Sequence, residues 1–147
     1  MAGGVLTQRN IAAELALEIA AAALKQGQAR GYHIAVAVVD RSGHLLVLLR
    51  GDEAGPHLID AARRKAFTAA SANSRTSAMS KAVDERSGVP DPHLVYLEGV
   101  LMVGGGVPIL ARGELIGAIG VAGSPGAIHD EECADTALAF AAARLES

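Results

Sequence analysis

Residues 33–50 read HIAVAVVD, then RSG, then HLLVLLR: two runs of aliphatic and β-branched residues on either side of a short polar stretch. Runs of this composition favour extended strands, and Arg41-Ser42-Gly43 supplies a turn that ends in glycine. The pattern therefore predicts a β-hairpin. Because the apolar content of both strands is nearly continuous, we expect both of their faces to be covered by other parts of the chain.

Helical patterns lie on each side of this hairpin. Thr7 is a candidate N-cap for a long amphipathic helix over residues 8–29, and Gly31 provides its stop. After a loop rich in glycine and proline, residues 58–73 predict a second helix. One short helix is expected near residues 76–83, within a polar stretch.

The second half of the chain returns to strand patterns, over residues 97–103, 107–111 and 114–121, and closes with a helix over 129–145. Three glycines thin the last strand and the residues after it, which indicates that something approaches its backbone closely: Gly117, Gly120 and Gly123. The resulting order is α-β-β-α-(α)-β-β-β-α. Because the strands come in hairpins without single helices between them, we expect one antiparallel sheet with helices packed on it, an α+β domain spanning 1–147.

Composition excludes several classes of function. The chain has a net charge of −3 and four aromatic residues, so neither a strong field for polyanions nor a stacking platform for single-stranded nucleic acid is expected. No apolar run is long enough to span a membrane, and because residues 1–9 lack a basic segment followed by an apolar one, no signal peptide is expected. Cys133 is alone and fits a reducing compartment, so a cytoplasmic location is predicted.

Lys65 lies on the apolar stripe of the second helix, where a core residue belongs. A lysine at such a position extends its ammonium to solvent, pairs with a buried carboxylate, or lines a cavity that holds an anionic ligand. The sequence leaves these three alternatives open. The run Gly104-Gly105-Gly106 is equally ambiguous, because it forms either a bulge or turn, or a set of bare N–H groups that face a ligand.

The last helix begins with His129 and Asp130, and Asp130 falls on its inward stripe, toward a pocket or the adjoining loop. His57 and His129 both lie where a glycine- and proline-containing loop meets a helix. Neither shows the close spacing of a metal site, so a surface or capping role is the ordinary interpretation of each. Cys133 is typical of a small core residue.

At these residues the sequence resembles the GlcG/HbpS family, also known as the haem-degrading-domain or DUF336 family. The resemblance covers nearly the whole chain and rests on the number and order of its motifs. These are Ala35-Val-Ala-Val-Val-Asp-Arg-Ser-Gly43, Arg50-Gly-Asp52, Ile59-Asp60, Lys65-Ala, Thr68-Ala, Gly105-Gly-Val-Pro108, and Gly117-Ala-Ile-Gly-Val-Ala-Gly123 with Asp130 after it.

The resemblance implies a profilin-like domain with a five-stranded antiparallel sheet flanked by helices, usually assembled into dimers or larger homo-oligomers. Some members of the family bind haem. Others are encoded beside enzymes of glycolate or diol catabolism, or form the C-terminal domain of PduO-type corrinoid adenosyltransferases.

We expect Lys65, Gly104–Gly106 and the His129–Asp130 helix start to converge on one cleft, within one chain or between subunits, and three hypotheses follow. In the first, the protein binds haem or another tetrapyrrole, with His57 or His129 as the iron ligand and with Lys65 and the glycine N–H groups holding a propionate. In the second, it is a catabolic enzyme that acts on a hydroxy- or oxo-acid, in which Lys65 holds the carboxylate or acts as base and His129 or Asp130 is its acid/base partner. In the third, it is a non-catalytic oligomeric accessory protein.

Overall fold

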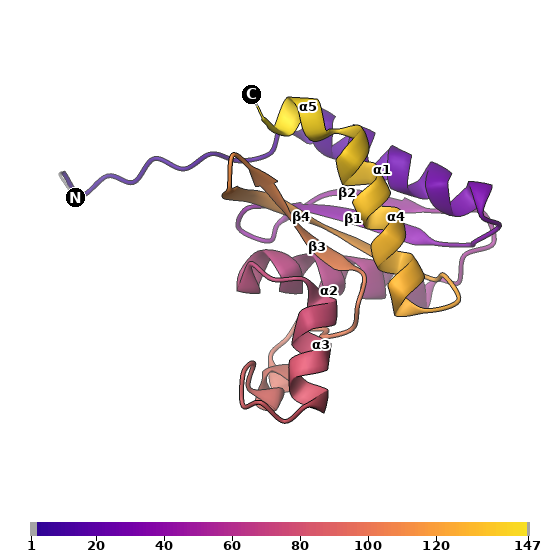
Figure 1. Ribbon diagram of the computed structural model, residues 1–147. Coiled ribbons are helices and arrows are strands. Elements are labelled where there is room, and N and C mark those ends of the chain that lie inside the picture. Colours follow the sequence, from indigo (N-terminus) through magenta and orange to yellow (C-terminus); the bar gives the residue numbers. More distant parts are fainter. Residues whose placement is uncertain (1–2, 147) are drawn as a thin grey trace.

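The computed structural model describes residues 3–146, as one layer of sheet between two layers of helix (Figure 1). Its elements, in chain order, are α1 (Ala13–Ala29), β1 (Ala35–Asp40), β2 (Leu45–Arg50), α2 (His57–Ala72), α3 (Thr76–Asp84), the 3-10 helix η1 (Pro92–Tyr96), β3 (Gly106–Ala111), β4 (Glu114–Ala122), α4 (Ala127–Phe140) and α5 (Ala142–Leu145). Antiparallel pairing gives the strand order β2-β1-β4-β3. The predicted α+β class, with helices flanking an antiparallel sheet, is confirmed.

Two hydrophobic cores lie on opposite faces of this sheet. In the first core, Ile19 of α1 packs with residues of α4 and with sheet residues such as Val36 and Ile119. In the second core, alanines of α2 pack against small side chains of β1 and β4. Figure 1 shows α1 and α4 side by side on one face and α2 on the other, with α3 and η1 projecting beyond α2. No helix within residues 3–146 is long and apolar enough to cross a membrane.

The hairpin predicted from residues 33–50 is present, but its two strands differ in burial. β1 is central in the sheet and is almost wholly buried, whereas β2 is an edge strand whose side chains are exposed or half-buried. The expectation that both faces of both strands are covered is therefore correct for β1 and wrong for β2. The opposite edge is β3, which carries Pro108, and the outer pairing at each edge contains a register shift.

The predicted fifth strand is absent: residues 97–103 form no strand, and the sheet has four strands within residues 3–146. Side chains, not a neighbouring strand, bind the backbone of this segment. Thr68 Oγ1 accepts from Leu101 N–H at 2.8 Å, and Arg64 donates to the Val100 carbonyl at 2.6 Å. Thr76 donates to the Val103 carbonyl at 2.6 Å. Two of the apolar residues that suggested a strand, Val100 and Met102, pack instead in a small core with Phe67 of α2.

The chain ends also differ from prediction. α1 begins at Ala13 and is capped by no side chain, so Thr7 is not its N-cap. Residues before it are extended because Ile11 N–H donates to the Ile116 carbonyl and the Asn10 side chain accepts from Arg41 N–H, which ties the entry segment to the sheet. The closing helix starts at Ala127 and is divided at Ala141 into α4 and α5.

Glycine in β4 lets α2 approach the sheet at backbone distance. A Cβ at Gly120 would lie 2.1 Å from the Ala62 carbonyl oxygen and 2.6 Å from the Ala66 nitrogen, both in the α2 backbone. The expectation from the sequence that something approaches this strand closely is confirmed, and the neighbour is α2.

We expect Gly120→Ala to lower the free energy of unfolding by about 1–3 kcal/mol or more, because α2 must move away from the sheet to admit the methyl group. Gly126→Ala is the matched control: its Cβ would meet only His129 Cδ2, at 3.9 Å, and its backbone is extended. Urea denaturation of the two variants compares them. Equal stabilities would show that the contact between α2 and β4 tolerates a side chain.

Candidate functional site

Lys65 and Asp130 form a buried ion pair between α2 and α4. Lys65 Nζ lies 3.1 Å from Asp130 Oδ2, and each side chain is only 6% exposed. Lys65 also donates to the Val121 carbonyl at 3.1 Å, and Asp130 Oδ1 accepts from Ser124 N–H at 3.0 Å. Of the three alternatives for Lys65, the structure shows pairing with a buried carboxylate.

Glycine at residues 104–106 leaves room for the ion pair of Lys65 and Asp130. A Cβ at Gly105 would lie 2.4 Å from the Val121 carbonyl oxygen and 3.0 Å from Lys65 Nζ, and the residue has a φ of +127°, which favours glycine. Gly106 N–H donates to Thr76 Oγ1 at 2.8 Å. Gly104 borders a hollow of about 470 Å³ between α3 and the start of α4. The structure thus brings Lys65, Gly105 and Asp130 together, in a packed interior.

His129, the neighbour of Asp130, belongs to a different cluster at the C-terminal end of α1. Its Nδ1 lies 3.4 Å from Glu132 Oε2, and its ring centroid lies 6.0 Å from that of Tyr32. Arg30 donates to the same Glu132 oxygen at 2.7 Å, and its guanidinium lies 5.9 Å from the Tyr32 ring centroid. His129 is 40% exposed, so its imidazole is accessible from solvent. We call Arg30, Tyr32, His129 and Glu132 the His129 cluster.

Charge within the cluster keeps Glu132 ionised. The hydrogen bond from Arg30, and secondarily that from His129, lowers the pKa of the Glu132 carboxyl. An ionised carboxylate beside Nδ1 favours the tautomer that carries its proton on Nδ1. The other ring nitrogen, Nε2, then has its lone pair available.

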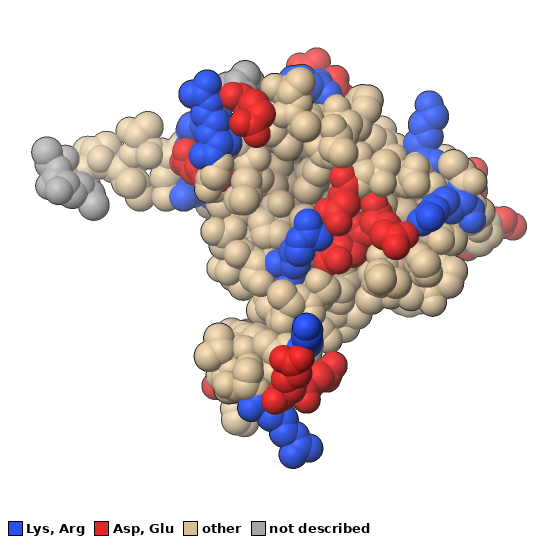
Figure 2. Space-filling model, viewed as in Figure 1, with Lys and Arg blue, Asp and Glu red and all other residues tan. Residues whose placement is uncertain are grey.

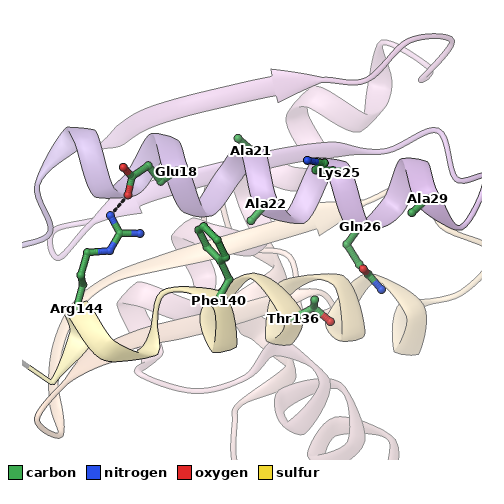
Figure 3. A pocket seen from close by; sticks show the side chains of 9 residues that line it. All are labelled: Glu18, Ala21, Ala22, Lys25, Gln26, Ala29, Thr136, Phe140 and Arg144. Carbon is green, nitrogen blue, oxygen red and sulfur yellow. Dashed lines mark hydrogen bonds and ion pairs between the residues drawn. The ribbon is translucent and has the colours of Figure 1, made fainter.

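A groove lies between α1 and α4. It has a volume of about 620 Å³, and its lining combines small, apolar and charged side chains: Glu18, Ala21, Ala22, Lys25, Gln26, Ala29, Thr136, Phe140 and Arg144. Figure 3 shows Phe140 projecting from α4 toward α1, with the ion pair of Glu18 and Arg144 at one end. His129, Glu132, Thr136 and Phe140 follow one another at three- and four-residue intervals on α4, so they share one side of that helix. The His129 cluster therefore lies beyond the Ala29 end of the groove.

His57 and Cys133 belong neither to the Lys65–Asp130 ion pair nor to the His129 cluster. His57 is the exposed first residue of α2 and takes part in none of the hydrogen bonds or ion pairs found between residues 3 and 146. Over the same residues, no group of three or more His, Cys, Asp or Glu side chains is placed to hold a metal ion. Cys133 is fully buried, and this burial raises the pKa of its thiol, as expected of a core residue.

Sequence reasoning singled out His129 but missed Arg30, Tyr32 and Glu132. The spacing of His129 and Glu132 on one helix was the available signal, since residues three apart are neighbours on a helix surface. Arg30 and Tyr32 come from the other end of the chain, and only the packing of α1 beside α4 brings them there.

Comparison with known proteins gives consistent results. A model of the family described as "Haem degrading protein HbpS-like" matches residues 11–139. Protein GlcG of Escherichia coli strain K12 is 34% identical over 110 residues, which are 74% of this chain and 78% of GlcG.

Solved structures extend the similarity to the fold. A double mutant of Streptomyces reticuli HbpS is 42% identical, with a TM-score of 0.84 over 95% of this chain and 93% of that one. The structure of a PduOC:heme complex is 25% identical, with a TM-score of 0.80 over 88% of this chain and 94% of the other. The match to the family model over most of the chain, together with these relatives, shows that the chain belongs to the HbpS-like family of haem degrading proteins.

Proposed function

We propose that this protein binds haem, for haem handling or degradation, with His129 as the iron ligand. The family description and the similarity to a haem complex supply the ligand class. The observation that carries the proposal is the accessible His129 imidazole, held by a carboxylate beyond one end of an apolar groove.

The environment of His129 suits a metal ligand. Histidines that bind metals usually donate their second ring N–H to a carboxylate or carbonyl, which fixes the ring and makes the coordinating nitrogen more basic. Glu132 is placed to accept that bond from Nδ1. Imidazole is a common axial ligand of haem iron, and bound haem supplies redox and oxygen chemistry. His57 remains a second candidate ligand, but no hydrogen bond or ion pair among residues 3–146 orients its ring.

The groove suits the rest of the haem. Its volume of about 620 Å³ lies in the range of small-molecule and cofactor sites, and its alanines leave room beside Phe140 for a flat apolar ring. Arg30 and Lys25 offer cations for the propionates. In the sequence-based hypothesis, Lys65 and Gly104–Gly106 held a propionate. Because Lys65 is buried in its pair with Asp130, we place that role instead on Arg30, whose side chain is 42% exposed, and on the exposed Lys25.

The enzymatic alternative depends on a reactive Lys65. Acid/base chemistry by Lys65, Asp130 or His129 on a hydroxy- or oxo-acid needs substrate to reach these groups, and the first two are nearly sealed from solvent. The third hypothesis, a non-catalytic oligomeric accessory protein, remains a prediction. The cytoplasmic location is also a prediction.

A haemin titration followed by visible spectroscopy tests the proposal. We expect a saturable, sharp Soret band for the unmodified protein and for His57→Ala, and an affinity at least tenfold weaker for His129→Ala because the iron loses its ligand. Glu132→Gln should weaken binding about 10- to 100-fold through loss of ring orientation. Loss of the band in His57→Ala alone would move the site to the start of α2. A broad, non-saturating band in every variant would reject specific haem binding.

A double-mutant cycle tests the role of Lys65. Lys65→Met should lower the free energy of unfolding by about 3–5 kcal/mol, because Asp130 is left buried without its cation. Adding Asp130→Asn should recover part of the loss, since the amide oxygen still accepts from Ser124 N–H and no charge remains. Thermal unfolding of Lys65→Met, Asp130→Asn and the double variant, each compared with the unmodified protein, measures this. A Lys65→Met variant with unchanged stability but lost ligand binding or activity would favour the enzymatic alternative.

A further inference from the structure

The start of α4 is tied to three other helices through three consecutive carboxylates. Asp130 pairs with Lys65 of α2, whose Nζ lies 3.1 Å from Oδ2 in the interior of the protein. Glu131 Oε1 accepts from Ser77 Oγ of α3 at 2.5 Å. The third carboxylate, Glu132, belongs to the His129 cluster, where it accepts from the residue that follows α1. Each of the three neighbours in sequence therefore binds a different part of the fold.

The tie to α3 is reinforced by Arg75, the residue before that helix. Its guanidinium lies 3.5 Å from Glu131 Oε1 and donates to both oxygens of Asp135, one turn further along α4, at 3.0 and 2.9 Å. Figure 2 shows acidic side chains gathered over α4, with basic side chains on both sides of them. α4 is therefore held from its buried side and from both of its exposed flanks.

Other features near the start of α4 fix the helix only weakly. The preceding loop, Gly123-Ser-Pro-Gly126, contains two glycines, and no side chain of residues 3–146 caps the first turn. The buried residues of α4 besides Asp130 are small: Cys133, Ala134 and Ala137. A face of small residues forms shallow ridges, so packing alone opposes rotation of the helix weakly. The loop is itself bound to the helix by a carboxylate, since Asp130 Oδ1 accepts from Ser124 N–H at 3.0 Å.

The directions of the three carboxylates matter for the His129 ring. Successive side chains point ~100° apart around a helix, so bonds from three of them in a row oppose rotation of α4 in both senses. A rotation of ~10° would carry an atom that lies ~5–6 Å from the helix axis through ~1 Å. Ligand sites require their side chains to stay within ~0.5 Å of the productive position. A small rotation of α4 would therefore displace the ring from its place beside Tyr32.

We propose that Asp130 and Glu131 are positioning residues for the His129 imidazole. Their bonds go to α2, α3 and the loop before α4, so they act on the ring only through the helix. By fixing the rotation of α4, they keep the ring beside Glu132 and Tyr32 before a ligand arrives. Exposed ion pairs contribute little to stability, so the contacts of Glu131 matter more for the position of α4 than for folding. That the ring binds iron rests on the proposed function, whereas its positioning does not.

Nitrogen NMR of the haem-free protein tests the inference. At about pH 8, above the ordinary pKa of histidine, proton–nitrogen correlation spectra show which ring nitrogen carries the proton. We expect Nδ1–H for His129 in the unmodified protein, because Glu132 accepts there. Glu131→Ala should mix the two tautomers, since the ring then moves relative to its acceptor. Glu131→Gln should restore the original spectrum, because its amide oxygen still accepts from Ser77 Oγ–H. An unchanged ring spectrum in Glu131→Ala would overturn the inference.

Glu114→Ala is the matched control for these spectra. Glu114 also ties two segments of the chain, since its Oε1 lies 3.0 Å from Arg41, but it stands at the end of β4 away from the loop that leads to α4. Its loss should leave the His129 ring spectrum unchanged. A change equal to that in Glu131→Ala would show that the ring responds to any weakening of the fold, and the inference would fail.

The contribution of Asp130 is measured in a variant that leaves no buried charge, Lys65→Met with Asp130→Asn. This variant keeps the bond from Ser124 N–H but loses the ion pair with α2. We expect the same mixture of His129 tautomers as in Glu131→Ala. A folded double variant, shown by far-UV circular dichroism, with the ring spectrum of the unmodified protein would refute the role of Asp130.

A haemin titration separates this inference from the proposed function. Glu131→Ala should weaken haemin affinity about tenfold when His129 is present and leave it unchanged in the His129→Ala background, because the carboxylate acts through that ring. An equal loss of affinity in both backgrounds would contradict a positioning role. If the unmodified protein binds no haemin, the proposed function fails, and the ring spectra alone decide whether the carboxylates position His129.

Discussion

The backbone contact between α2 and the sheet is the constraint on which the rest of the structure depends. At Gly106 and Gly120 no Cβ fits, so α2 lies against β3 and β4 more closely than ordinary side chains allow. This closeness lets Lys65 reach across the end of β4 to Asp130. Asp130 in turn holds the turn at Ser124 and the start of α4. The start of α4, which carries His129, is thus tied to a contact on the opposite face of the sheet.

Much of this fold is predictable because its signals are local. The hairpin at residues 33–50, the helix stripes and the glycines of β4 each depend on neighbouring residues, and the structure confirms them. Residues 97–103 show where local signals fail. Their composition is that of a strand, but hydrogen bonds with the side chains of Arg64, Thr68 and Thr76 decide their conformation. Those partners are distant in sequence, so no pattern within the segment could reveal them.

The candidate site, like the fold, could be predicted from the sequence only in part. Lys65 was recognisable as a charge on an apolar stripe, and Asp130 as an acid on an inward face, but their pairing is a tertiary contact. His129 was recognisable by its place at a helix start, whereas Arg30 and Tyr32 were not, because about a hundred residues separate them from it. Family membership supplied the ligand class, which neither geometry nor composition provides.

The two edges of the sheet have a consequence for behaviour in concentrated solution. β3 carries Pro108, which has no N–H to offer a neighbouring strand, and both outer pairings contain a register shift that bends the strand concerned. Open strand edges are the usual templates for amyloid-like growth, and these interruptions oppose it. A chain that is half hydrophobic can thus leave both edge strands of its four-stranded sheet unpaired without pairing them to the strands of other copies.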